Sequence, residues 1–138
     1  MQELKIVVEA TKTNLGKVFD FISKQLSSYS CNENTISKIN IGVEEIFVNI
    51  SNYAYENIGG EVEISCEVLG PPLRVEISFL DSGKRFNPLT YTEPDTTLPI
   101  ENRKVGGLGI LLTKKLMDDV QYEYIDGKNM IKIVKELN

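Results

Sequence analysis

The sequence contains no histidine. This absence excludes a Ser-His-Asp triad, histidine ligation of a metal ion and a phosphohistidine relay within the chain. Any acid–base chemistry must therefore use carboxylates, lysine, tyrosine or cysteine.

Cysteine is also scarce, with Cys31 and Cys66 the only two. We expect ordinary reduced thiols, because a metal site needs more ligands at closer spacing and disulfides are rare in the cytosol. Residues 1–6 carry charges where a signal peptide needs an apolar core, and no apolar run approaches the roughly 20 residues that span a bilayer. These absences predict a cytoplasmic protein without a membrane partner.

Positive charge is in deficit: 15 Lys and Arg stand against 20 Asp and Glu, a net charge of −5. Broad binding to nucleic acid or to an anionic membrane needs a basic surface, so the balance disfavours both partners. A chain of 138 residues is long enough to bury a core without disulfide or metal cross-links. We expect one domain over residues 1–138.

Apolar periodicity and turn residues predict the order strand, helix, helix, strand, strand, loop, helix, strand, strand. The predicted strands are residues 4–10, 61–69, 73–80, 119–126 and 130–137, and the predicted helices are 15–28, 34–55 and 108–117. A proline-containing loop fills 82–105, longer than passive connections usually are. We predict an α+β two-layer sandwich, with helices on one face of a mixed, mostly antiparallel sheet.

Four residues of the second predicted helix, Gly42, Glu45, Asn49 and Asn52, fall within one narrow sector at about 100° per residue. A carboxylate followed four residues later by an amide places a proton acceptor beside a metal ligand. The same pair also fits a solvent-facing stripe, since helices routinely expose Glu and Asn. Glu44 points about 100° away and reads as an ordinary surface carboxylate.

Two further segments allow both a structural and a functional interpretation. Asp81 and Gly83 follow a predicted strand, where they are compatible with an ordinary turn. Alternatively, the Asp81 carboxylate could accept a hydrogen bond from an exocyclic amine, and Gly83 could let a flat ring lie against the backbone. The glycines at 106, 107 and 109 precede a helix, where they fit an ordinary loop or a phosphate cradle of backbone N–H groups. The pattern is neither a dinucleotide fingerprint nor a P-loop.

Taken together, these segments resemble the N, G1 and G2 boxes of the histidine-kinase-like ATPase superfamily, also called the GHKL or Bergerat-fold proteins. Within it, residues 4–137 most resemble the small anti-sigma factor serine kinases of bacteria. The matching positions are Glu45 and Asn49 in the N-box, Asp81, Gly83, Phe86 and Pro88 in G1, and Gly107, Gly109 and Ile110 in G2.

The resemblance implies a role for each box. Glu45 would be the general base, Asn49 the Mg²⁺ ligand and Asp81 the carboxylate that reads adenine. Residues 107–109 would hold phosphate through their backbone, and residues 87–105 would form a mobile lid over ATP. The implied ATP contacts are Asn49, Asn52, Tyr53, Asp81, Gly83, Phe86, Gly107, Leu108, Gly109 and Ile110.

Three features depart from the family pattern. Tyr53 stands where relatives often have histidine, and Lys132 is the position that we match to a threonine of the last strand near the adenine. The lid segment lacks a second glycine-rich stretch and instead carries residues 95–97 (Asp-Thr-Thr) and Arg103 with Lys104. Arg103 and Lys104 could contact phosphate, a partner or solvent, and the sequence does not choose among the three.

The resemblance implies a cytoplasmic serine/threonine protein kinase and anti-sigma factor that uses ATP and Mg²⁺. It would phosphorylate a STAS-type anti-anti-sigma partner and alternately hold a sigma factor, with a homodimer left open. The missing histidine and phosphoacceptor domain disfavour a sensor histidine kinase. The alternatives are a nucleotide-dependent binding module without kinase activity and a slow ATPase. Glu45 favours an enzyme, because binding alone needs no base.

Overall fold

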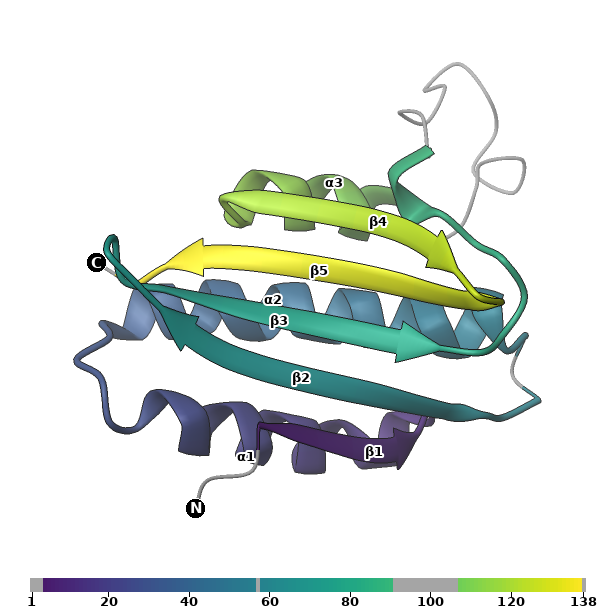
Figure 1. The fold of residues 1–138 in the computed structure, drawn as a ribbon, viewed down its shortest axis with the longest axis horizontal. Coiled ribbons are helices and arrows are strands. Elements are labelled where there is room, and N and C mark those ends of the chain that lie inside the picture. The colour runs from purple at the N-terminus through teal and green to yellow at the C-terminus, as the bar shows by residue number, and fades with distance from the viewer. Residues whose placement is uncertain (1–3, 57, 91–106, 138) are drawn as a thin grey trace.

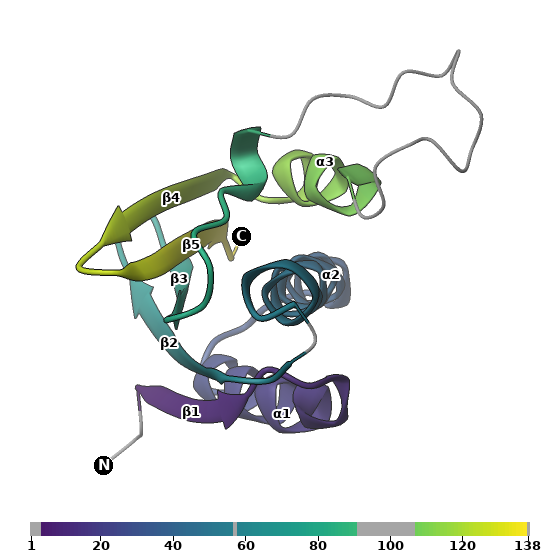
Figure 2. The same cartoon turned by 90° about the vertical axis from the view of Figure 1, so that its right-hand side faces the viewer.

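The structure is a computed structural model that describes residues 4–56, 58–90 and 107–137. Three helices lie on one face of a five-stranded sheet whose strand order is β1-β2-β3-β5-β4 (Figures 1 and 2). The α+β two-layer prediction is confirmed, and all four strand pairings are antiparallel rather than mixed. The elements are β1 (Lys5–Glu9), α1 (Leu15–Leu26), α2 (Glu33–Asn49), β2 (Glu61–Leu69), β3 (Arg74–Asp81), α3 (Gly107–Leu116), β4 (Asp119–Ile125) and β5 (Lys128–Glu136).

The core lies between the sheet and the helices. Alternate residues of β2, β3 and β5 face the helices because side chains of a strand point to opposite faces in turn. The apolar stripe of α2 packs onto them, as its 3.6-residue period predicts. The largest fully buried side chains include Phe47, Phe79, Ile39, Ile46, Ile64, Ile77, Ile131 and Ile133.

Helix α2 carries the polar sector and is bounded by a side-chain cap at its start and a π-helical turn at its end. It begins at a cap in which the Thr35 N–H donates to Asn32 Oδ1 at 2.8 Å. It ends in a π-helical turn, Ile50–Ala54, within the region predicted as continuous helix. π-Helical turns are frequent at functional sites, and this one rotates the residues after Asn49 away from ideal α-helical spacing.

Gly42, which the sequence placed in the polar sector, packs beneath α3 instead. A Cβ added there would meet the Met117 side chain at 3.4 Å. The same Cβ would lie 3.6 Å from the Thr113 side chain of α3; both are ordinary contact distances, so Gly42 belongs to the buried contact between α2 and α3 and not to a polar surface. The polar sector begins at Glu45, one turn further along the helix.

The connection between β1 and α1 is held by hydrogen bonds to the end of the strand. The Asn14 side chain does not cap α1; its Nδ2 donates to Glu9 O at 2.9 Å. The Thr11 N–H donates to the same carbonyl at 2.8 Å. Both bonds close the end of β1, which is an edge strand of the sheet.

The β4–β5 hairpin is tighter than predicted. Only Asp126 and Gly127 form its turn, with φ of 53° and 76°, as in the two-residue turns that suit a twisted hairpin. Asn129, which the sequence assigned to the turn, therefore belongs to β5 and lies opposite Asp81 of β3.

The predicted lid is only partly covered by the structure. Its first residues include a short 3₁₀ turn, Pro88–Thr90, while residues 91–106, with Arg103 and Lys104, lie outside the described residues. Across the described part of the chain, no helix has the length and apolar character needed to cross a membrane.

Candidate functional site

Three segments far apart in the sequence meet at one end of the sheet: the π-helical turn after α2, the loop after β3 and the start of β5. The Lys84 N–H donates to Ala54 O at 2.7 Å, which ties the loop to the turn. A Cβ added at Gly83 would lie 2.5 Å from the same oxygen. Close backbone approach thus requires a glycine at 83, whether or not a ring lies against it.

Asp81, the last residue of β3, has a buried carboxylate of which one oxygen has no hydrogen-bond partner within the described residues. It is 2% exposed. Its Oδ1 accepts from the Gly83 N–H and from Asn129 Nδ2, both at 2.9 Å. Its Oδ2 has no partner in the described structure. Burial raises the pKa of this carboxyl, and the bonds from Asn129 and Gly83 oppose that rise.

Asn129 is the residue that organises this end of the sheet, and sequence reasoning missed it. It is 1% exposed. Its Nδ2 donates to Asp81 and, at 2.9 Å, to Lys84 O. Its Oδ1 accepts from the Phe86 N–H at 3.0 Å and from the Tyr122 hydroxyl at 2.5 Å. Both N–H donors and both acceptor sites of the amide are therefore used.

Lys132 is not the residue near Asp81, contrary to the sequence-based match. It pairs with Ser78 in the register of β3 and β5, three residues from the Asp81–Asn129 pair. It lies on the sheet face away from the helices, where its Nζ is 3.4 Å from Glu76 Oε1. The error arose because the turn was predicted too long, which hid the strand residue that faces Asp81.

Two tyrosines join the π-helical turn to its surroundings. The Tyr53 and Phe86 rings stack with centroids 5.0 Å apart and an interplanar angle of 26°. The Tyr55 hydroxyl donates to Glu61 O at 2.6 Å and accepts from the Ser82 N–H at 2.9 Å. The turn, the start of β2 and the loop after β3 are thus held as one unit, and Phe86 lies beside Tyr53 as the sequence grouping implied.

Glu45 and Asn49 lie one turn apart on α2, and Asn52 is half-buried in the π-helical turn. Asn49 is 3% exposed, and its Nδ2 has no partner within the described residues. Burial raises the pKa of the partly buried Glu45 carboxyl, and the charge of Glu44 raises it further. A carboxylate with a raised pKa is a better proton acceptor. Glu44 itself is exposed, as predicted.

The glycine-rich segment forms the first turn of α3, which begins at Gly107. First-turn N–H groups have no partner within their helix and carry the positive end of its dipole. Residues 107–109 can therefore donate to an anion through their backbone. Ile110 is 4% exposed and belongs to the core, so its side chain anchors the turn.

The two buried polar atoms without partners are the site's clearest chemical signal. Among the side chains that the structure describes, only Asp81 Oδ2 and Asn49 Nδ2 are buried and unsatisfied. Such atoms are rare in folded proteins, because burial without a hydrogen bond is unfavourable. A ligand with an amine beside Asp81 and polar groups beside Asn49 would satisfy both.

Residues 8–135 match the family model of the histidine kinase-like ATPase domain. The chain belongs to this family, as the three boxes predicted. Among its relatives is the serine-protein kinase RsbW of Halalkalibacterium halodurans, 28% identical over 91% of this chain and 78% of the relative. The RsbW of Bacillus mycoides is 32% identical over 66% of this chain and 58% of that protein.

Solved structures support the fold. The RsbU and RsbW domains of Rv1364c from Mycobacterium tuberculosis match with a TM-score of 0.65 and 14% identity, over 96% of this chain and 32% of that one. The histidine kinase domain of a blue-light activated histidine kinase from Erythrobacter litoralis matches with a TM-score of 0.57 and 14% identity, over 91% of this chain and 60% of that one. At this identity the matches establish the fold alone.

Proposed function

We propose that this chain is a cytoplasmic, single-domain serine/threonine protein kinase and anti-sigma factor that uses ATP and Mg²⁺. The observation that carries the proposal is the pair of unsatisfied buried atoms, Asp81 Oδ2 and Asn49 Nδ2. Asp81 Oδ2 is an acceptor that an exocyclic amine would satisfy, and Asn49 Nδ2 is a donor that a phosphate oxygen would satisfy. RsbW relatives, named as serine-protein kinases, support the choice of reaction.

The residues fit ATP and Mg²⁺ in the following way. Asp81 Oδ2 would accept from the exocyclic amine of adenine, and Tyr53 and Phe86 would flank this end of the pocket. First-turn N–H groups of α3 would hold phosphate. No cluster of three or more acidic or cysteine side chains that could hold a metal occurs in the described residues. By the family resemblance, the Asn49 amide oxygen would hold Mg²⁺, an ion that usually takes few protein ligands beside the phosphates of its substrate.

Glu45 would accept the proton of the substrate hydroxyl. Phosphoryl transfer depends mainly on positioning, charge stabilisation and an oriented base. No hydrogen bond or ion pair within the described residues engages the Glu45 carboxylate, so it is available for this task. When bound, Mg²⁺–ATP supplies the phosphoryl group and neutralises its developing charge.

The phosphate acceptor would be a serine of a STAS-type anti-anti-sigma protein, and a sigma factor would be held alternately. The names of the RsbW relatives support a serine as the acceptor, whereas the STAS-type and sigma-factor partners rest on the resemblance to anti-sigma factor kinases. A nucleotide-dependent binding module remains the second candidate, because binding ATP needs Asn49 and Asp81 but no base.

The test compares Glu45→Gln with the wild type and with Glu44→Gln as the matched control. Each protein is incubated with radiolabelled ATP and a candidate STAS-type protein from the same organism, and labelled serine is scored. Glu45→Gln should bind ATP normally by calorimetry, while transfer falls by about 10² to 10⁴, the usual contribution of a positioned acid–base group. Glu44→Gln should transfer at the wild-type rate.

Wild-type transfer by Glu45→Gln would refute the assignment of the base. If the wild type labels no serine but binds the partner only with ATP, the binding-module function replaces the kinase. Absence of calorimetric heat at millimolar ATP would remove the nucleotide site altogether.

A further inference from the structure

Strand β1 ends the sheet, and its outer edge is open within the described residues. The Cys66 N–H donates to Leu4 O at 2.9 Å, and the Ala10 N–H donates to Gly60 O at 2.8 Å. Because an antiparallel ladder alternates its bonds, residues 4, 6, 8 and 10 direct their backbone groups at β2. The N–H and C=O groups of Lys5 and Val7 therefore point outward.

Natural proteins usually protect such an edge with prolines, bulges or charges. The middle of β1 is instead Ile6, Val7 and Val8, and the Val7 side chain is 55% exposed. The free edge ends at Glu9, whose carbonyl is already bonded to Thr11 and Asn14. A short row of backbone groups thus faces outward, long enough for one added strand.

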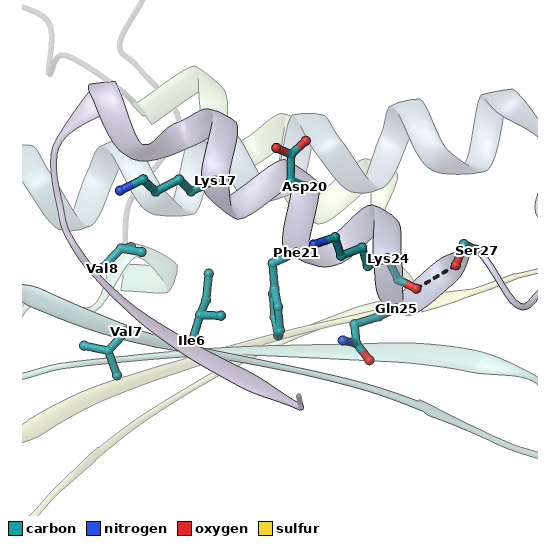
Figure 3. A pocket seen from close by; sticks show the side chains of 9 residues that line it. All are labelled: Ile6, Val7, Val8, Lys17, Asp20, Phe21, Lys24, Gln25 and Ser27. Atoms are coloured by element: carbon teal, nitrogen blue, oxygen red, sulfur yellow. Dashed lines mark hydrogen bonds between the residues drawn. The ribbon is translucent and has the colours of Figure 1, made fainter. Parts of the chain in front are cut away.

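A groove of about 870 Å³ runs between this edge and α1 (Figure 3). Its apolar floor includes Ile6, Val8 and Phe21, and the Phe21 ring points from α1 toward the strand (Figure 3). An extended segment paired with β1 would direct alternate side chains into this groove. The groove therefore adds side-chain selectivity to the backbone pairing that the edge offers.

The rim of the groove is basic in a chain whose net charge is −5. Lys17 and Lys24 project from α1 along it, with the single acid Asp20 between them, and all three are exposed. Seven helical residues separate the lysines by about 10 Å. Two acids four positions apart on a strand, with an apolar residue between them, are about 14 Å apart. The long, flexible lysine side chains can splay apart by the remaining few ångströms to meet them.

We propose that the groove between β1 and α1 binds an extended segment of a partner protein as a sixth strand. The segment carries an apolar side chain over Phe21 and acidic side chains on either side of it, which meet Lys17 and Lys24. The site is separate from the nucleotide residues, so it stands or falls independently of the proposed kinase activity.

The test measures the fluorescence anisotropy of a fluorescein-labelled heptapeptide as the whole protein chain is added. The peptide sequence is Thr-Glu-Thr-Val-Thr-Glu-Thr. We expect binding below millimolar concentration that weakens as salt rises. The same peptide with lysine in place of glutamate should bind at least tenfold more weakly. The glutamate peptide N-methylated at alternate amides, which blocks strand pairing, should lose binding.

Variants test the chain's side of the contact. Lys17→Glu with Lys24→Glu should weaken the glutamate peptide about tenfold, whereas Lys38→Glu with Lys115→Glu, an equal charge change at exposed positions outside the groove, should not. Val7→Pro removes an outward N–H without taking a bond from β2, because edge strands accept proline at such positions. It should abolish binding while the melting temperature stays within a few degrees.

Several outcomes would overturn the proposal: no binding at millimolar peptide, equal affinity for the lysine and glutamate peptides, or full binding of the N-methylated peptide. Sedimentation provides one more. A dimer that Val7→Pro dissociates and that excludes the peptide would show that the edge pairs with a second copy of the chain instead. If Val7→Pro fails to fold, the N-methylated peptide still decides the case on the wild-type protein.

Discussion

Replacing Asp81 by asparagine should make the protein more stable and worse at binding ATP. The substitution keeps the size of the side chain but removes a charge that is 2% exposed. Burial raises the pKa of this carboxyl, with the bonds from Asn129 and Gly83 opposing it. The folded protein therefore binds the proton more readily than the unfolded chain, and the ionised carboxylate lowers stability at neutral pH.

The size of both effects follows from the hydrogen bonds. An asparagine oxygen can keep the two bonds that Asp81 Oδ1 accepts, whereas Oδ2 has none to lose. We expect a gain of about 1 kcal/mol, within the usual range for relieving a destabilised functional residue. If Asp81 binds the adenine amine as proposed, the variant's amide N–H would face that amine and a charge-assisted bond of roughly 1.5–3 kcal/mol would be lost. ATP should then bind about 10- to 150-fold more weakly.

Urea unfolding and calorimetry measure the two effects separately. The stability gain of Asp81→Asn should be full above the raised pKa of Asp81 and should vanish as pH falls below the pKa of the unfolded chain, because both proteins are then neutral at this position. Titrations with ATP and with inosine triphosphate, which lacks the exocyclic amine, should converge for the variant. A variant that is less stable at pH 7, or that binds ATP as tightly as the wild type, would refute the reasoning.

Three further predictions follow from packing. Gly83→Ala should destabilise the protein by about 1–3 kcal/mol in urea unfolding, because its Cβ meets a backbone oxygen, whereas Gly16→Ala, with open space in α1, should stabilise it by about 0.5–1 kcal/mol. Asn129→Ala should lower stability by about 2–4 kcal/mol and weaken ATP binding, since its lost bonds leave buried groups unpaired; a change below 1 kcal/mol would contradict this. Burial raises the pKa of the Cys66 thiol to about 12, so a thiol reagent at pH 8 should label Cys31 first and Cys66 only on unfolding.

The order and type of the three α-helices and five strands in the described residues could be predicted from their apolar patterns, whereas the π-helical turn Ile50–Ala54 could not. Alternation in β2 and β3 around the Gly70–Pro72 turn indicated a hairpin, and the structure forms one. The stripe of α2 likewise matched its buried face. Local pattern suffices where burial on one face decides the conformation.

The network around Asp81 could not be predicted, because it depends on register. The turn residues of the sequence predict a last turn that extends to Asn129, and the family resemblance then matches the adenine-side position to Lys132. Strand register depends on turn length, and an error of a few residues moves a different side chain opposite Asp81. Gly42 shows a similar limit: helical spacing placed it with Glu45, and only the position of α3 explains it.

The length of the two-residue turn at Asp126 and Gly127 determines whether Asn129 faces Asp81, and with it the proposed binding of nucleotide. Inserting a single residue into β5 before Asn129 would turn that amide to the outer face of the sheet and leave Asp81 without its partner. The Gly70–Pro72 connection precedes β3, at the end of that strand opposite Asp81, and takes part in none of the contacts around Asp81 and Asn129. A fluorescent reporter or a fused domain for following nucleotide binding therefore belongs at the Gly70–Pro72 connection, while the β4–β5 turn must keep its length.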